Sequence, residues 1–472
     1  MRAVTILLPR PRVIFSLPRG GHLTLADARL ALTSWLLAKK GGGTLVVRLE
    51  GSAFGVHQRL YEDLQWLGLQ VDEGPGLGGA LGPYCQAERA ELYTRYLDKL
   101  LHEQSAFRCF CVPQWAQATD SVPPHCTAEC FRLSEQRVEE LIRNGSRFFV
   151  RLKGHAGEII FADLLRGPLA LRAESAGDII LAMPNGAPSA CFRAAIDDAL
   201  MMITHAVRDE SALPSTLSQV LICRALELEA PRVGHLPPVR ATTAYWAAAE
   251  QPQLTVEQLR RDGYFPGTVL SFLARLAGIS IGDVHLRTAS ELVPHFRIEE
   301  LSKYEAVLDL QVLREESQRQ LRALSAEELR NALQPYLGRL GFAENDPRLP
   351  QLVNLYRDWA FSVGDLAQKL SVFAFHGVPV MDKGAVQYLA RDSSQKVLWS
   401  LVRQMRSLRH LDEQVLSRLM VAVRQETGLM GRDLWTPVRL ALTGQQEGPS
   451  LPQVVALMGR ERCQKLLEMS LG

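Results

Sequence analysis

The stretch TLVVRL, residues 44–49, is a short run of branched apolar side chains, which is typical of a strand buried on both faces of a sheet. A similar strand-like run, VIF, occupies residues 13–15, and the apolar residues between 25 and 39 recur with the period of a helix. Two more helical patterns follow, at residues 61–66 and 90–103. This alternation predicts a parallel β-α-β sheet in the first part of the chain.

Residues 107–185 interrupt the alternation, and we expect an inserted subdomain there. They contain a group of cysteines, a helical pattern at 134–144 and a strand-like segment at 148–152. The alternation then returns and is expected to complete the sheet. Its patterns are helical at 192–207 and 215–228 and strand-like at 233–238.

From about residue 255 to the end, one amphipathic helical pattern follows another, which predicts an all-helical C-terminal part. The patterns lie at 256–262, 267–276, 302–324, 326–340, 349–361, 384–389, 394–408, 412–427, 435–443 and 451–471.

The bulk composition is that of a globular protein with more than one domain. The chain has 472 residues, of which 47% are hydrophobic and 22% charged. The net charge of +2, from 53 basic against 51 acidic residues, means that any surface for nucleic acid must be local. No run of about twenty uncharged apolar residues occurs, so a membrane span is not expected.

The first 26 residues contain four arginines and no acidic residue, a bias shared with organelle transit peptides. Residues 4–8 also fit a strand of the fold itself, which would leave little to cleave. We therefore expect either the mitochondrial matrix or a bacterial-type cytoplasm, and not secretion.

Eight cysteines are present, and four of them, Cys109, Cys111, Cys126 and Cys130, fall within 22 residues. This clustering fits a metal knuckle better than a secreted disulfide framework, since four thiolates suit a structural Zn²⁺. The alternative is a set of buried free cysteines.

Several short motifs, in the same order along nearly the whole chain, resemble those of the glutamyl-tRNA synthetase family of bacterial or mitochondrial type. The motifs are GPYCQAER at 82–89 with ELY at 91–93, FADL at 161–164 with RG at 166–167, IDD at 196–198, ITHAVR at 203–208, HLP at 235–237, DGYFP at 262–266, and LALTG at 440–444 with GP at 448–449. The resemblance implies an α/β Rossmann-type class I catalytic domain with an inserted subdomain, followed by an all-α anticodon-binding-like domain. It places a first Rossmann-type half at 1–106, the connective insertion at 107–185, the second half at 186–240, a stem-contact-like helical region at 241–320 and the anticodon-binding-like domain at 321–472.

The two motifs with which this family activates ATP are degenerate. The four positions of the HIGH motif are Thr24, Leu25, Ala26 and Asp27, so both histidines are missing and a carboxylate stands near the expected triphosphate. The KMSKR motif falls on residues 246–250, from Trp246 to Glu250, and no lysine occurs between 153 and 303. Loss of one transition-state donor typically costs about 3 kcal/mol, so these changes argue against ATP binding and adenylate formation.

The glutamate pocket implied by the resemblance is only partly kept. Its arginine, tyrosine and asparagine positions are Ile14, Ala190 and Ala194, and a serine position is Pro18. Three charged pocket positions match the family, namely Glu50, Arg208 and Glu210. They either retain ligand binding or form a buried ion pair that braces the sheet.

The family resemblance also bears on zinc and on RNA. Many members carry a zinc knuckle in the insertion; its fourth ligand position is Arg132 here, so Cys126 or His125 would replace it. In the C-terminal part, Arg439, Gly448, Pro449 and Leu451 match positions beside the anticodon loop. Unstacked bases are read by stacking and main-chain hydrogen bonds, although an ordinary helix-helix turn would give the same sequence.

The leading hypothesis is a catalytically inactive relative of these synthetases that binds tRNA or another structured RNA. It would act as a regulator, with an active synthetase as partner, or as a subunit of a ribonucleoprotein such as a mitochondrial ribosome. The alternative is a divergent active glutamate–tRNA ligase, which aminoacylates tRNA-Glu with ATP. A third hypothesis is a protein-interaction module that no longer binds RNA.

Overall fold

The computed structural model describes residues 10–17, 21–50, 56–111, 126, 129–154, 157–241, 254–282, 286–342, 346–374 and 377–471. The chain forms two compact units. Unit 1 comprises Met1–Glu257 with Val269–Asp309, and unit 2 comprises Gln258–Thr268 with Leu310–Gly472. The finer predicted division at residues 106, 185, 240 and 320 stays a prediction.

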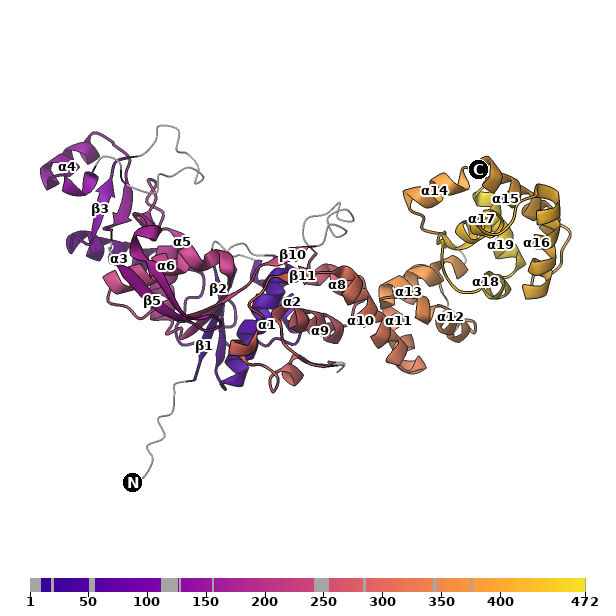
Figure 1. Cartoon of the computed structure of the whole chain (residues 1–472), viewed down its shortest axis with the longest axis horizontal. Helices are drawn as coiled ribbons and strands as arrows, with labels where there is room; N and C mark the ends of the chain where they lie inside the picture. Colours follow the sequence, from indigo (N-terminus) through magenta and orange to yellow (C-terminus); the bar gives the residue numbers. More distant parts are fainter. Residues whose placement is uncertain are drawn as a thin grey trace, which may run out of the picture. The chain divides into compact units, whose positions relative to one another are not determined.

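A four-stranded parallel sheet with the order β2-β1-β8-β9 lies at the centre of unit 1 (Figure 1). The strands are β1 (Arg12–Leu17), β2 (Thr44–Leu49), β8 (His205–Asp209) and β9 (Arg232–Leu236). Leu45, Val46 and Val47 of β2 are fully buried, as expected for a strand covered on both faces. The parallel β-α-β sheet predicted from the sequence is therefore confirmed.

Helices connect these strands as in other parallel sheets. The helix after β1, α1 (Leu25–Lys40), packs on β1, β2 and β8, and buries Leu32 and Leu36 completely. The further helices are α2 (Val56–Trp66), α3 (Ala90–His102), α5 (Ala190–Leu200) and α6 (Leu213–Ala225).

The predicted inserted subdomain is present between α3 and α5. It contains an antiparallel sheet of order β3-β4-β7 and a hairpin, β5-β6. Its elements are β3 (Ala106–Cys109), η3 (Cys130–Arg132), α4 (Glu135–Arg143), β4 (Phe149–Leu152), β5 (Glu158–Asp163), β6 (Gly167–Arg172) and β7 (Ile180–Ala182).

The next elements are β10 (Val239–Ala241), α8 (Val256–Arg261), α9 (Pro266–Ala277) and β11 (Ala306–Leu308). Residues 258–268, which include most of α8 and the start of α9, belong to unit 2. β10 and β11 pair in parallel. The unit 2 helices are α10 (Leu310–Ala323), α11 (Ala326–Leu340), α12 (Leu349–Tyr356), α13 (Val363–Leu370), α14 (Lys383–Leu389), α15 (Asp392–Met405), α16 (Glu413–Thr427), α17 (Arg432–Thr443), α18 (Leu451–Met458) and α19 (Arg460–Met469).

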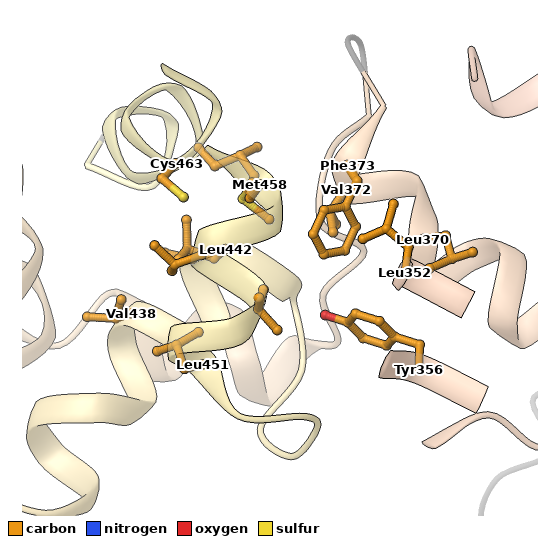
Figure 2. Packing of buried hydrophobic residues seen from close by; sticks show 14 of the residues in the cluster. Leu352, Tyr356, Leu370, Val372, Phe373, Val438, Leu442, Leu451, Met458 and Cys463 are labelled. Carbon is orange, nitrogen blue, oxygen red and sulfur yellow. The ribbon is translucent and has the colours of Figure 1, made fainter. Parts of the chain in front are cut away.

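Unit 2 has a hydrophobic core of its own. Figure 2 shows Tyr356 and Phe373 on one side of this core and Leu442, Leu451 and Met458 on the other. All five side chains are buried. Burial of one side chain of this size typically contributes about 1.5–3 kcal/mol, so the core accounts for the cohesion of these short helices.

Three predicted boundaries are wrong. Residues 192–207 are not one helix, because α5 ends at Leu200 and residues 205–209 form β8. Residues 302–324 begin with β11, and α10 starts only at Leu310. The helix predicted at 451–471 is interrupted at Gly459, which has a φ of 78° that glycine adopts without strain. No helix in the described ranges combines the length and the apolar character that a membrane span requires.

Candidate functional site

A cavity of about 340 Å³ opens at the carboxyl ends of three parallel strands. Ser16 lines it at the end of β1, Glu50 directly follows β2, and Arg208 lies near the end of β8. Asp27 of α1 and Ala194 of α5 also line it. Ligands of open parallel sheets bind at this edge of the sheet, so this is the candidate site.

Two buried aspartates at the end of α5 hold the cations of the cavity. Arg48 Nη1 donates to Asp198 Oδ1, and Arg48 Nε lies 3.8 Å from Asp197 Oδ2. Arg208 Nη2 lies 3.5 Å from Asp198 Oδ2. Burial lowers the pKa of Arg208, and the nearby carboxylate of Asp198 opposes this effect. At Arg48, the carboxylates of Asp198 and Asp197 outweigh the effect of burial and raise the pKa.

A chain of buried hydrogen bonds fixes Arg208 from behind. Arg208 Nη1 donates to Thr216 Oγ1 at 3.0 Å, and this hydroxyl lies 2.9 Å from Nε2 of His235. On its other side, His235 Nδ1 lies 2.6 Å from Asp163 Oδ2. Asp163 and His235 are fully buried, so Arg208 has little freedom to change its position.

The residues at the degenerate HIGH positions form the start of α1. Thr24 is the N-cap residue, and its hydroxyl accepts a hydrogen bond from the backbone N–H of Asp27 at 3.2 Å. The Asp27 carboxylate reaches back to the N–H of Thr24 at 3.3 Å and to its hydroxyl at 2.6 Å. This capping box places a negative charge of the chain itself at the positive end of the helix dipole.

The three predicted pocket residues do not remain together. Glu50 and Arg208 line the cavity, and Glu50 accepts a hydrogen bond from Ser16 at 3.3 Å. Glu210 instead pairs with Arg166 at 2.7 Å. Arg208 pairs instead with the carboxylate of Asp198, a residue of the IDD motif.

The four clustered cysteines converge in the insertion. Their sulfur atoms all lie within 4.8 Å of one another, and Cys111 Sγ is 3.7 Å from both Cys126 Sγ and Cys130 Sγ. Zn–S bonds of about 2.3 Å in a tetrahedron require sulfur atoms about 3.8 Å apart, so these residues fit a zinc ion.

The backbone also suits anionic sulfur. The N–H of Phe110 donates to Cys130 Sγ at 3.4 Å, and the N–H of Cys130 donates to Cys126 Sγ at 3.3 Å. Burial raises the pKa of Cys109 to about 12 and that of Cys130 to about 11, so both stay protonated thiols at neutral pH unless a cation is bound.

In unit 2, Arg439, Gly448 and Pro449 meet at a small cavity beside Trp359 and Lys369. Nη1 of Arg439 is buried and donates to no acceptor among the described residues, so a ligand could supply an acceptor. Trp359 is 44% exposed, which leaves an aromatic face at the edge. Leu451 does not line this cavity, because its side chain is buried in the core of unit 2.

The KMSKR positions Trp246 and Glu250, as well as Pro18, lie outside the described residues. Gln219 accepts a hydrogen bond from Arg208 Nη2 and donates to Asp198 Oδ2 at 2.6 Å. Three residues that fix Arg208 were thus not predicted as site residues: Thr216, Gln219 and His235. His235 belongs to the HLP motif, so the sequence could have indicated it as a site residue. Thr216 and Gln219 lie in no motif.

A parallel sheet with an inserted subdomain, a cavity at its carboxyl edge and a following helical unit together define a class I aminoacyl-tRNA synthetase frame. The family model described as "tRNA synthetases class I (E and Q), catalytic domain" matches residues 17–315, and the model described as "Anticodon binding domain" matches residues 328–470. The chain belongs to the glutamyl-tRNA synthetase family.

Full-length relatives agree with this assignment. The chain is 30% identical to glutamate–tRNA ligase 1 of Syntrophomonas wolfei over 474 residues, with 98% of this chain and 96% of that protein covered. It is 28% identical to glutamate–tRNA ligase 2 of Caldanaerobacter subterraneus over 479 residues, covering 98% and 99%. The crystal structure of glutamate–tRNA synthetase from Elizabethkingia anophelis superposes with a TM-score of 0.69 at 23% identity, covering 98% and 99%, which shows the same fold.

Proposed function

We propose that this member of the family binds tRNA but does not activate glutamate with ATP. The observation that carries the proposal is the capping box between Thr24 and Asp27. A helix N-terminus attracts a phosphate because its N–H groups are unpaired and its dipole is positive. In this chain the Thr24 hydroxyl accepts from the N–H of Asp27, and the Asp27 carboxylate supplies negative charge at this end of the helix.

The charge of the cavity supports the same proposal. Among the described lining residues, the carboxylates are Asp27, Glu50 and Asp209, and the cations are Arg48 and Arg208, both of which face Asp198. Adenylate formation builds negative charge on a phosphate, which several cations must offset, whereas here the two guanidiniums share Asp198 and are outnumbered by the three lining carboxylates. The residues at the KMSKR positions add no lysine.

ATP–pyrophosphate exchange in the presence of glutamate tests the proposal, with and without tRNA-Glu. The Syntrophomonas wolfei ligase, measured in parallel, is the positive control. We expect exchange from this chain to equal the enzyme-free background. Glutamate-dependent exchange that is abolished by Ala194→Phe, which fills the cavity, would overturn the proposal.

The proposed tRNA contact lies at the unit 2 cavity. The unpartnered Nη1 of Arg439 and the exposed ring of Trp359 offer a cation and a stacking surface, which suit an unstacked base. We expect Arg439→Ala to weaken tRNA-Glu binding by about tenfold in filter-binding assays, and Arg330→Ala, on an exposed position of α11, to leave it unchanged. Binding should also fall steeply as salt rises. Equal affinities of the two variants would contradict this contact.

The second candidate is a divergent active glutamate–tRNA ligase, and the comparisons favour it more directly than inactivity. The relatives carry that name over nearly the whole length of this chain. The cavity also keeps Glu50 and Arg208. Under this candidate a partner subunit would supply the missing cations, and aminoacylation of tRNA-Glu by this chain in extract, lost on its immunodepletion, would identify it.

We further propose a structural Zn²⁺ held by Cys109, Cys111, Cys126 and Cys130, because the sulfur spacing fits tetrahedral coordination. An active synthetase or a ribonucleoprotein such as a mitochondrial ribosome is the proposed protein partner. The proposed compartment is the mitochondrial matrix or a bacterial-type cytoplasm. Imaging and fractionation of the tagged full chain, followed by identification of bound RNA, distinguish these settings.

A further inference from the structure

The buried charges beneath the cavity do not balance. Three guanidiniums, those of Arg48, Arg89 and Arg208, share two carboxylates, those of Asp197 and Asp198. The side chains of Arg48 and Arg89 are only 2% exposed, whereas that of Arg208 is 20% exposed. The surplus positive charge is therefore available to the cavity at Arg208, where an anionic group of a ligand would be stabilised.

Two lining carboxylates, those of Asp27 and Glu50, form no ion pair within the described residues, and that of Asp27 is held by hydrogen bonds from Thr24. Glu50 accepts a hydrogen bond from the hydroxyl of Ser16, and the described residues form no ion pair with it. Glu50 and Arg208 line the same cavity and lie close enough for the charge of Glu50 to act on the pKa of Arg208. One carboxylate and one ammonium on the same small molecule would satisfy both groups at once.

The rest of the described wall is mainly apolar. Ile14 of β1, Leu30 of α1, Ala194 of α5 and Val207 of β8 line it. An aliphatic side chain gains from contact with this wall, whereas a second carboxylate would lose its water there and, among the described lining residues, would find only Arg48, which Asp197 and Asp198 already hold. Such a carboxylate would also meet the negative charges of Asp27 and Glu50.

We infer that this cavity binds a neutral aliphatic α-amino acid of about the size of leucine or methionine, in preference to glutamate. The inference deepens the proposed function and rests on it, because the amino acid is bound and not activated. Arg208 binds the α-carboxylate, Glu50 binds the α-ammonium, and the side chain packs against Ile14 and Ala194. The volume of about 340 Å³ is that of a small-molecule site.

Isothermal titration of the full chain with L-leucine and with L-glutamate tests the inference. We expect leucine to bind at least about tenfold more tightly. Leucinamide, which lacks the carboxylate, and N-acetyl-leucine, which lacks the ammonium, should each bind at least about tenfold more weakly than leucine. Equal or tighter binding of glutamate, or no binding of any neutral amino acid, overturns the inference.

Two variants separate this site from binding elsewhere. Ala194→Phe fills the cavity and should abolish leucine binding, whereas Ala390→Phe, at an exposed position of unit 2, should leave it unchanged. Ile14→Arg adds a cation to the wall and should shift the preference towards glutamate. Circular dichroism and thermal melting show whether each variant is folded; unchanged leucine binding in folded Ala194→Phe contradicts the site.

The exchange assay keeps the two proposals apart. If ATP–pyrophosphate exchange stays at the enzyme-free rate with every amino acid and leucine does not bind, only the present inference is overturned. Exchange that depends on leucine overturns the proposed inactivity and leaves the specificity standing. Exchange that depends on glutamate overturns both.

Discussion

Under the proposed function, the side chain of Asp27 opposes the binding of a nucleotide phosphate by its charge and not by steric blocking. Its carboxylate lies at the amino end of α1 and accepts hydrogen bonds from both the N–H and the hydroxyl of Thr24. A phosphate brought to the same place would meet a negative charge and N–H groups that already have a partner.

Replacement of Asp27 by alanine should therefore destabilise unit 1, although the residue lies where a ligand would bind. We expect the free energy of unfolding to fall by about 1 kcal/mol, because half of the capping box and a favourable helix-dipole interaction are lost. Urea denaturation followed by circular dichroism measures this change. Asp98→Ala, at an exposed position of α3, is the matched control, and equal stability of the two variants would contradict the role of the cap.

Asp163 makes the stability of unit 1 sensitive to acid. Burial acts to raise its pKa, but the hydrogen bonds from His235 and from the N–H groups of Arg166 and Leu165 outweigh burial, so the pKa lies below its ordinary value. A carboxyl group with a lowered pKa in the folded state stabilises the protein above the unfolded-state pKa of about 3.9, and this contribution is lost as the pH falls through the folded-state pKa.

The free energy of unfolding should thus be higher for the wild type than for Asp163→Asn at pH 6, and the difference should shrink below about pH 4. Urea titrations between pH 3 and pH 6 measure this difference. A difference that stays constant over this range would show that the charge of Asp163 contributes nothing.

Individual residues were predictable where a motif fixes them and not where a partner comes from far along the chain. The sequence places Asp27, Glu50 and Arg208 at one site through the family motifs. It does not reveal that Arg48 pairs with Asp198, since 150 residues separate them. The spacing of the four cysteines, in contrast, carries its own chemistry and was informative before any fold was known.

At the scale of elements, the cysteine cluster joins β3 to η3. Cys109 ends β3, Cys130 begins η3, and Cys111 lies beside both. A zinc ion would add bonds between segments that are otherwise joined by few buried side chains.

Elemental analysis of the purified chain should find about one zinc per chain, and Cys111→Ser should lower this value to near zero. Cys85→Ser is the control, because Cys85 lies outside the cluster and should not affect zinc content. Chelation should also lower the melting temperature of unit 1. Full zinc content in Cys111→Ser would rule out this ligand set.

Elements were predicted best where the apolar period is long and the ends are marked. The helix predicted at 326–340 matches α11, which begins at a Ser325 capping box and ends at Gly341 with a φ of 79°. The helix predicted at 192–207 fails because its apolar run continues through the turn into β8. That turn contains Met202 at a φ of 53°, a conformation that no local pattern signals for methionine.

At the scale of the whole molecule, each unit has its own buried cluster. Among the described residues, the cluster of unit 2 contains residues from Leu321 onward, whereas three clusters of unit 1 contain buried residues no further along the chain than Val233. The order of domains followed from the motifs, whereas the assignment of residues 258–268 to unit 2 did not, because it depends on contacts such as that between Ser362 Oγ and Asp262 O at 2.6 Å.

Two cores predict two unfolding transitions in calorimetry. Asp27→Ala should lower the midpoint of one transition only, and Leu398→Ala, in the core of unit 2, should lower the other. A leucine truncated in a core typically costs about 2–5 kcal/mol, enough to resolve the two midpoints. A single transition shifted by both variants would show that the units unfold together.

The capping box of α1 also bears on the behaviour of the protein in a cell. An enzyme whose folded state is stabilised by a bound nucleotide becomes more vulnerable to proteolysis when that nucleotide is scarce. Here the carboxylate at the amino end of α1 belongs to Asp27 of the chain itself, so under the proposed function the stability of unit 1 does not depend on a bound nucleotide. The abundance of this protein should therefore remain constant when starvation depletes adenine nucleotides.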